Sequence, residues 1–123
     1  MTIREAIDRV DLVKPNRQND QQKIAWLSDL DRLVYNELVL THEGCHKPFD
    51  GYDLETPQDT VLLVPAPYTD IYLYYLSSQI DLANAELARY NNDKTMFNNA
   101  YLTYSDYYTK KNMPLQRCKG FRL

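Results

Sequence analysis

The chain has 123 residues, a formal net charge of -3, 44% hydrophobic residues and 25% charged residues. This size and composition are those of one globular domain with its own core, and they exclude wholesale disorder. No apolar run approaches the roughly 18 residues of a membrane span, and the N-terminal residues lack the apolar core of a secretory signal. We therefore expect an intracellular protein that makes no membrane contact.

The charges are distributed unevenly along the chain. Residues 110–123 contain five Lys or Arg and no acid, so the remainder carries a charge of -8. An acidic body is expected to repel DNA, whereas the basic end is not. Cys45 and Cys118 are the only cysteines, and in an intracellular chain we expect free thiols.

Two helices are predicted in the first third of the chain. Thr2 and Glu5 have the spacing of a capping box, and Ile3, Ile7 and Val10 keep a helical period until Pro15. Asn19 or Asp20 is the next expected cap, for a second helix from about residue 20 to residue 41. Its apolar stripe comprises Ile24, Leu27, Leu30, Val34 and Leu38.

Residues 42–66 contain the turn and stop signals of an irregular connection. The run "TVLLVP" within it has the length and β-branched character of a strand. We expect a projecting loop or a small β-hairpin between the second and third helices. A connection of this length is usually functional or flexible.

The third and fourth helices are predicted to form an antiparallel hairpin. Apolar and aromatic residues in steps of three and four indicate one stripe from Tyr72 to Tyr90 and another from Phe97 to Tyr108, separated by a break at "YNND", with Asp93 as a cap. The polar face of the third helix is expected to comprise Asp70, Ser77, Asp81, Asn84 and Asn91. The predicted architecture is thus an all-α, four-helix domain over residues 1–114, followed by a flexible basic tail over 115–123.

No catalytic constellation is recognisable. His42, Cys45 and His46 fit neither a regular zinc motif nor an oriented nucleophile pair, and a solvated loop accounts for them. "FDGYDLE" lacks the ligand spacing of a calcium loop. Asp29 and Asp31 point to different sides of a helix and are expected on a solvated face. We expect no metal, no cofactor and no enzymatic activity.

The tyrosines are more informative, because tyrosine supplies large contact area at protein interfaces at low entropic cost. Tyr72, Tyr90, Tyr101, Tyr104 and Tyr108 lie on stripes that a hairpin buries, so we assign them to the core. The candidate subunit-interface residues are those outside the stripes or in the long connection, namely Tyr68, Tyr74, Tyr75, Phe49 and Tyr52.

The order of these features resembles small head-to-tail adaptor proteins of tailed bacteriophages and prophages. The resemblance covers about residues 20–114 and depends on "WLSDLDRLVYNEL", "VPAPYTDIYLYYLSSQIDLANAELARYNND" and "MFNNAYLTYSDYYTKKNMP". It implies a structural protein that forms a homo-oligomeric ring below the portal, extends the DNA channel and binds neck or tail proteins. DNA contact would be transient and non-specific.

The resemblance also implies a location and a docking segment. The protein would belong to the head-tail junction of the virion and to the host bacterial cytoplasm during assembly. By position, the portal-docking tail would comprise Arg117, Lys119, Phe121, Arg122 and Leu123. Two other functional hypotheses stay open. One is a small helical regulatory or DNA-binding module that uses the basic tail, and the other is a metal enzyme that uses His42, Cys45 and His46.

Overall fold

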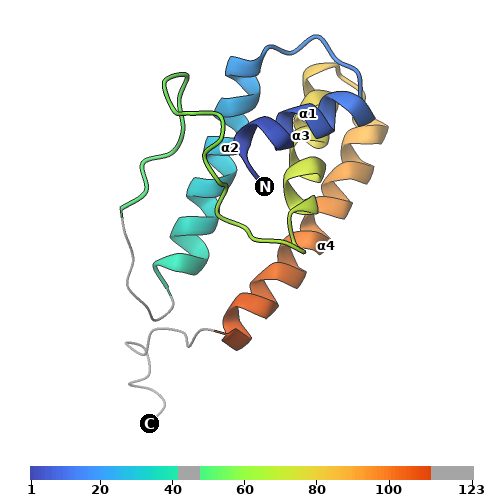
Figure 1. Ribbon diagram of the computed structural model, residues 1–123. Coiled ribbons are helices and arrows are strands. Elements are labelled where there is room, and N and C mark those ends of the chain that lie inside the picture. The colour runs from blue at the N-terminus through green and yellow to red at the C-terminus, as the bar shows by residue number, and fades with distance from the viewer. Residues whose placement is uncertain (42–47, 112–123) are drawn as a thin grey trace.

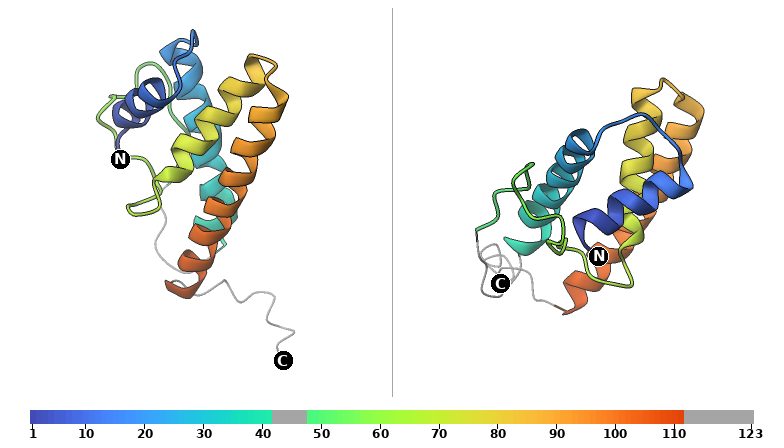
Figure 2. Two further views of the ribbon diagram at one scale, coloured as in Figure 1. Left: turned by 90° about the vertical axis from the view of Figure 1, so that its right-hand side faces the viewer. Right: turned by 45° about the horizontal axis from the view of Figure 1, so that its top comes forward.

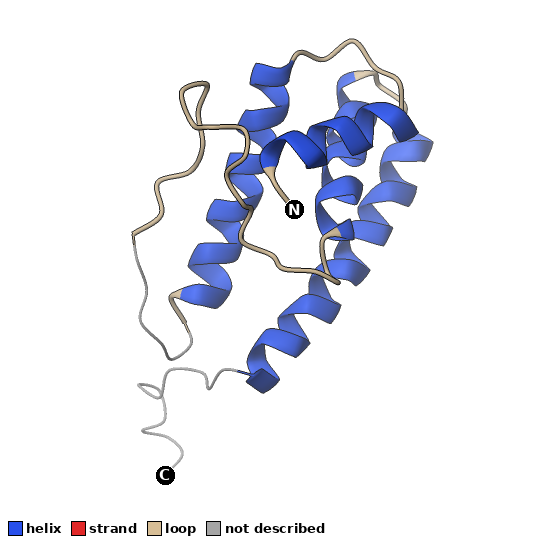
Figure 3. Ribbon diagram, viewed as in Figure 1, coloured by secondary structure: helices blue, strands red, loops and turns tan. Residues whose placement is uncertain are grey.

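In the part of the chain that the structure describes, four α-helices and one π-helical turn form the framework (Figures 1 and 3). The computed structural model describes residues 1–41 and 48–111. The elements are α1 (Ile3–Val13), α2 (Asp20–Val34), η1 (Tyr35–Val39), α3 (Asp70–Ala83) and α4 (Leu87–Lys111). No strand forms within the described ranges, so the predicted all-α class is confirmed.

The first two helices begin where the sequence predicts. The Thr2 hydroxyl accepts from the Glu5 amide, and the Glu5 carboxylate accepts from the Thr2 amide at 2.9 Å, which completes the capping box. Asn19 caps α2 by accepting from the Gln22 amide. The whole predicted stripe of α2 and η1 is buried. The π-helical turn η1 ends this helix near the predicted boundary.

Helices α3 and α4 lie side by side as an antiparallel pair, seen from two directions in Figures 1 and 2. Tyr72, Leu76 and Ile80 of α3 are fully buried, and Phe97 and Tyr104 of α4 are almost so. Helix α1 packs against both α2 and α3. The core therefore lies between the α3–α4 pair, α2 and α1.

The turn between α3 and α4 is earlier than predicted. It comprises residues 84–86, and "YNND" lies inside α4. The Ala85 and Glu86 amides donate to the Leu82 and Asp81 carbonyls, the two hydrogen bonds of a Schellman motif, with Ala85 in the left-handed region at φ 57°. Glycine usually occupies this left-handed position after a helix, but here the residue is Ala85. Asn91 and Asn92 are exposed on α4, where a helix tolerates them.

The last part of the segment before α3 packs on the body, whereas residues 53–55 and 57–59 are exposed. Leu62 and Val64 are buried. The predicted strand "TVLLVP" forms only an isolated antiparallel bridge between Thr2 and Val61, because its partner becomes α1 at Ile3. The Ile3 amide donates to the Thr60 carbonyl at 3.1 Å.

Asp31 connects this segment to the helices. The prediction of a solvated face is correct for Asp29 but wrong for Asp31, whose side chain is fully buried. Its carboxylate accepts hydrogen bonds from the Tyr52 hydroxyl at 2.5 Å, the Tyr72 hydroxyl at 2.7 Å and the Leu63 amide at 3.1 Å. One side chain thereby joins α2, α3 and the segment of residues 48–69.

Ser28 and Arg32 extend this contact along α2. The Tyr52 amide donates to the Ser28 hydroxyl at 3.0 Å, and Arg32 donates to the Asp50 carbonyl at 2.7 Å. Gly51 lies between these contacts at φ 92°, where a Cβ would come within 2.3 Å of the Ser28 hydroxyl oxygen. Glycine is therefore required here for both its backbone conformation and its small size.

Replacing Asp31 by alanine is expected to lower the free energy of unfolding by about 3 kcal/mol, because it leaves buried hydroxyl and amide donors without an acceptor. Asp29→Ala, two residues away but exposed, is the matched control and should change it by less than about 0.5 kcal/mol. Urea unfolding measures both values. Equal effects from the two substitutions would contradict the structural role of Asp31.

Replacing Ala85 by glycine is expected to stabilise the protein by about 1 kcal/mol, because glycine adopts the left-handed conformation without steric cost. Ala25→Gly is the control with the opposite sign: Ala25 is exposed within α2, and glycine there should cost about 1 kcal/mol. Thermal and urea unfolding of both variants test the position of the turn. A destabilising Ala85→Gly would be inconsistent with the Schellman geometry.

Candidate protein-binding surface

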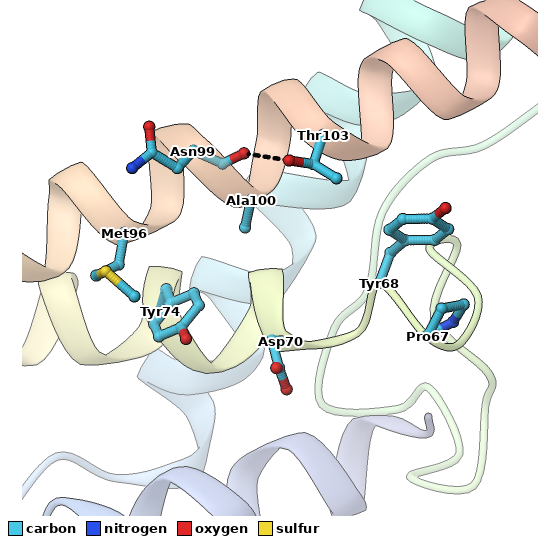
Figure 4. Close-up of a pocket in the computed structure, with 8 residues that line it drawn as sticks. All are labelled: Pro67, Tyr68, Asp70, Tyr74, Met96, Asn99, Ala100 and Thr103. Carbon is cyan, nitrogen blue, oxygen red and sulfur yellow. Dashed lines mark hydrogen bonds between the residues drawn. The ribbon is translucent and has the colours of Figure 1, made fainter.

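A groove runs along one flank of the α3–α4 pair (Figure 4). Its upper part is a cavity of about 280 Å³ with a mainly apolar lining, and its lower part is a second cavity of about 350 Å³. Tyr68 and Thr103 border both cavities, so the two cavities adjoin each other on this flank. The upper lining comprises Pro67, Tyr68, Asp70, Tyr74, Met96, Asn99, Ala100 and Thr103, and the lower lining comprises Tyr68, Thr103, Asp106, Tyr107 and Lys110.

Regular helix geometry positions these side chains. Met96, Ala100, Thr103 and Tyr107 follow steps of three and four on α4, so they form one row beside its buried stripe. Figure 4 shows Tyr74 and Tyr68 on the opposite wall, contributed by α3 and the residues just before it. The ring of Tyr68 packs against the ring of Tyr107 on α4, with 4.8 Å between the centroids, so aromatic side chains from both walls meet in the groove.

Charged groups border the groove. Asp70 begins α3 and pairs with Arg9 of α1 at 3.1 Å. Asp106 is exposed, and no residue in 1–41 or 48–111 forms an ion pair with it. Lys110 lies at the lower end. The groove thus combines apolar contact area with a rim of mixed charge, in which Asp70 is paired with Arg9 and Asp106 lies in the same lining as Lys110.

The five predicted interface residues belong to three different environments. Tyr68 and Tyr74 line the groove. Tyr75 packs on Phe97 with ring centroids 5.2 Å apart, so part of its surface already contributes to the hairpin. Phe49 and Tyr52 form an edge-to-face pair at 5.2 Å on the other side of the molecule.

Phe49 also contacts Tyr35, at 5.8 Å between centroids, which makes a second partly exposed aromatic cluster, here called the Phe49 cluster (Tyr35, Phe49 and Tyr52). Figures 1 and 2 place residues 48–58 on the side of α2 that faces away from α3 and α4. The groove and the Phe49 cluster are therefore separate surfaces.

Tyr101 and Tyr104 on α4 are contact residues whose hydroxyl pKa values are raised. Burial, followed by the neighbouring Tyr108 and Tyr107 hydroxyls, raises the pKa of Tyr104 to about 12. Burial and a hydrogen bond to Glu37 also raise the pKa of Tyr101. Such hydroxyls keep their protons at neutral pH, so these side chains offer area and hydrogen bonds and no acid-base chemistry.

A buried ion cluster was missing from the sequence-based expectations. The Lys14 ammonium lies 2.5 Å from Asp81 and 2.9 Å from Asp93. Asp81 and Ser77, expected on a polar face of the third helix, are buried because α1, α2 and α4 surround α3. The pairs join residues 67 and 79 positions apart, a separation that no local pattern reveals.

Burial and hydrogen bonding have opposing effects on the pKa values in this cluster. Burial lowers the pKa of Lys14, but its hydrogen bonds to Asp81 and Asp93 outweigh that effect and raise the pKa overall. Burial, and then the proximity of Asp93, raises the pKa of Asp81. Lys14 thus fixes the C-terminal end of α1 to α3 through Asp81 and to α4 through Asp93.

The remaining predicted residues lie outside the described ranges. These are His42, Cys45 and His46 of the long connection and Arg117, Lys119, Phe121, Arg122 and Leu123 of the tail.

The stability of the wild-type chain relative to an Asp31→Asn variant is expected to fall as the pH rises above about 4. Burial raises the pKa of Asp31 above its ordinary value of 3.8, despite the hydrogen bonds from Tyr52, Tyr72 and Leu63. The folded chain therefore holds this proton more tightly than the unfolded chain. The resulting stabilisation is complete below about pH 4 and is lost as the pH rises through the folded pKa. Urea titrations across this range measure the difference, and a wild-type advantage that grows with pH would contradict it.

No group of three or more His, Cys, Asp or Glu side chains within the described ranges is placed to hold a metal ion. No helix there is long and apolar enough to cross a membrane. Comparisons with protein-family models, with curated proteins and with solved structures found no match.

Proposed function

We propose that the protein is a structural component of a tailed bacteriophage or prophage, a head-to-tail adaptor. In this proposal it forms a ring under the portal, extends the DNA channel and joins the head to the tail. Its partners are the portal, the neck or tail proteins and sister copies of itself. It acts at the head-tail junction of the virion after assembly in the host cytoplasm, without a cofactor or a catalytic residue.

The observation that carries the proposal is the presence of two aromatic surfaces on different sides of one small domain. A ring is built from heterologous contacts, in which one surface of a subunit meets a different surface of the next. The groove and the Phe49 cluster meet this requirement. Tyrosine and phenylalanine suit such contacts, because they bring large area with few rotatable bonds.

The charge distribution supports the same function. The chain outside residues 110–123 carries -8. A conduit with a strongly basic lumen would bind DNA by releasing counterions and slow its passage, whereas an acidic body allows only transient contact. The basic residues of the tail are then available for a protein partner. In the proposal, the residues that dock on the portal are Arg117, Lys119, Phe121, Arg122 and Leu123.

The test is to mix the protein with the portal protein encoded in the same phage or prophage genome and to image the particles by electron microscopy. The wild-type chain should add a ring of density below the portal. Met96→Glu, which puts a charge into the groove, should abolish that ring without loss of stability, because Met96 is 42% exposed.

Leu102→Glu is the matched control. Leu102 lies on the same helix, is 61% exposed and does not line the groove, so its ring should persist. Absence of added density with the wild-type chain would argue against the adaptor function. Salt-sensitive binding of DNA by the isolated chain, lost on removing residues 112–123, would favour the DNA-binding module instead.

A further inference from the structure

One oxygen of the Asp81 carboxylate is buried without a hydrogen-bond donor. The Asp81 side chain is 0% exposed, and its Oδ1 accepts from the Lys14 ammonium at 2.5 Å. No residue within 1–41 or 48–111 donates to its Oδ2. A buried carboxylate oxygen without a donor raises the free energy of the folded chain. Binding one more proton at this oxygen is therefore favourable.

The Asp93 carboxyl group is placed to share such a proton. The Lys14 ammonium lies 2.9 Å from it, and the Asp81 and Asp93 carboxyl groups are within hydrogen-bonding range of each other. Two ionised carboxylates offer each other no donor, and one ammonium balances only one of their two charges. We propose that Asp81 and Asp93 share a single proton, and that loss of this proton weakens the attachment of the C-terminal end of α1 to α3 and α4.

The cations on the neighbouring helices do not take the place of this proton. On α2, the buried Lys23 pairs with Asp11 of α1 at 2.5 Å. On α4, Arg89 is exposed and pairs with Glu86 at 3.1 Å. Arg89 contributes a weaker electrostatic effect that favours the ionised form of Asp93. With both carboxylates ionised, the cluster thus keeps one negative charge that no ion pair balances.

The pKa values of the two carboxyl groups are shifted in opposite directions. Burial, and then the hydrogen bond with Asp93, raises the pKa of Asp81. Burial opposes ionisation of Asp93 as well, but its hydrogen bonds with Asp81 and Lys14 lower its pKa overall. The folded chain therefore binds the first proton of the pair more tightly than the unfolded chain does, and the second less tightly.

The sign of the pH dependence follows from these directions. The raised pKa gives a stabilisation that is complete below the ordinary value of 3.8 and is lost as the pH rises through the folded pKa. The lowered pKa gives one that is present above 3.8 and is lost as the pH falls. The pair thus stabilises the fold most near pH 4.

The consequence is local to the end of α1 and does not rest on the proposed function. Lys14 is the residue through which this end reaches α3 and α4. Once the proton is lost, opening the end of the helix lets water solvate the excess charge. Ile3, Ile7 and Val10 stay in the core, so the end of α1 should open more often at neutral pH than at pH 4.

Asp81→Asn tests the shared proton, because its amide permanently supplies the hydrogen that Oδ2 lacks. The urea midpoint of this variant minus that of the wild-type chain should increase as the pH rises above about 4. Asp29→Asn removes one negative charge from an exposed position and is the matched control, with a difference that stays constant. A constant difference for Asp81→Asn as well would overturn the shared proton.

Carbon-13 NMR of the wild-type carboxyl groups gives a second readout that needs no variant to fold. The pair should titrate in two steps, one above and one below about pH 4. If both carboxyl groups titrate below pH 4, Lys14 balances them without a shared proton, and the proposal fails.

Hydrogen exchange tests the attachment of α1. The Lys14 amide donates to the Val10 carbonyl at 2.8 Å in the last turn, and the Ala6 amide donates to the Thr2 carbonyl at 3.0 Å in the first. In the wild-type chain, protection of the Lys14 amide, corrected for the intrinsic rate, should fall above pH 4 relative to that of Ala6. In Asp81→Asn this ratio should be constant. A constant ratio in the wild-type chain would overturn the role of the proton in holding α1.

Discussion

A buried carboxylate holds the parts of this domain together. Without Asp31, α2, α3 and the segment of residues 48–69 would have no common polar contact at the centre of the molecule. Its three donors satisfy the charge, but no cation lies among them, so its burial remains costly. The free-energy cost of burying this carboxylate is tolerated because Asp31 accepts from a backbone amide of the irregular segment. Without this acceptor the buried amide would be unpaired over an apolar core, which costs more free energy.

The helices could be predicted because their signals are local. The capping box at Thr2, the cap at Asn19 and the stripe of α2 each depend on residues within one or two turns. The turn at Ala85 could not, because a left-handed residue other than glycine leaves no mark in the sequence. The buried roles of Asp31 and Lys14 were also hidden, since their partners are distant in the chain.

The candidate surface was predicted only in part. Tyrosines off the helical stripes indicated interface positions, and two of them, Tyr68 and Tyr74, do line the groove. Met96, Ala100 and Thr103 were missed, because a row beside a core stripe looks like ordinary helix surface until its neighbouring helix is placed. Tyr52 also has a structural role that composition cannot show, because its hydroxyl donates a hydrogen bond to Asp31.

The three-residue turn at Ala85 bears on the order in which the chain folds. Contacts between α3 and α4 close a short loop and lose little chain entropy, whereas the bridge from Thr2 to Val61 and the contact from Lys14 to Asp81 each span about half of the sequence. We therefore expect the helical pair to nucleate early and α1 to join late. An emerging chain would then keep its N-terminal helix undocked until nearly all of α4 had left the ribosome.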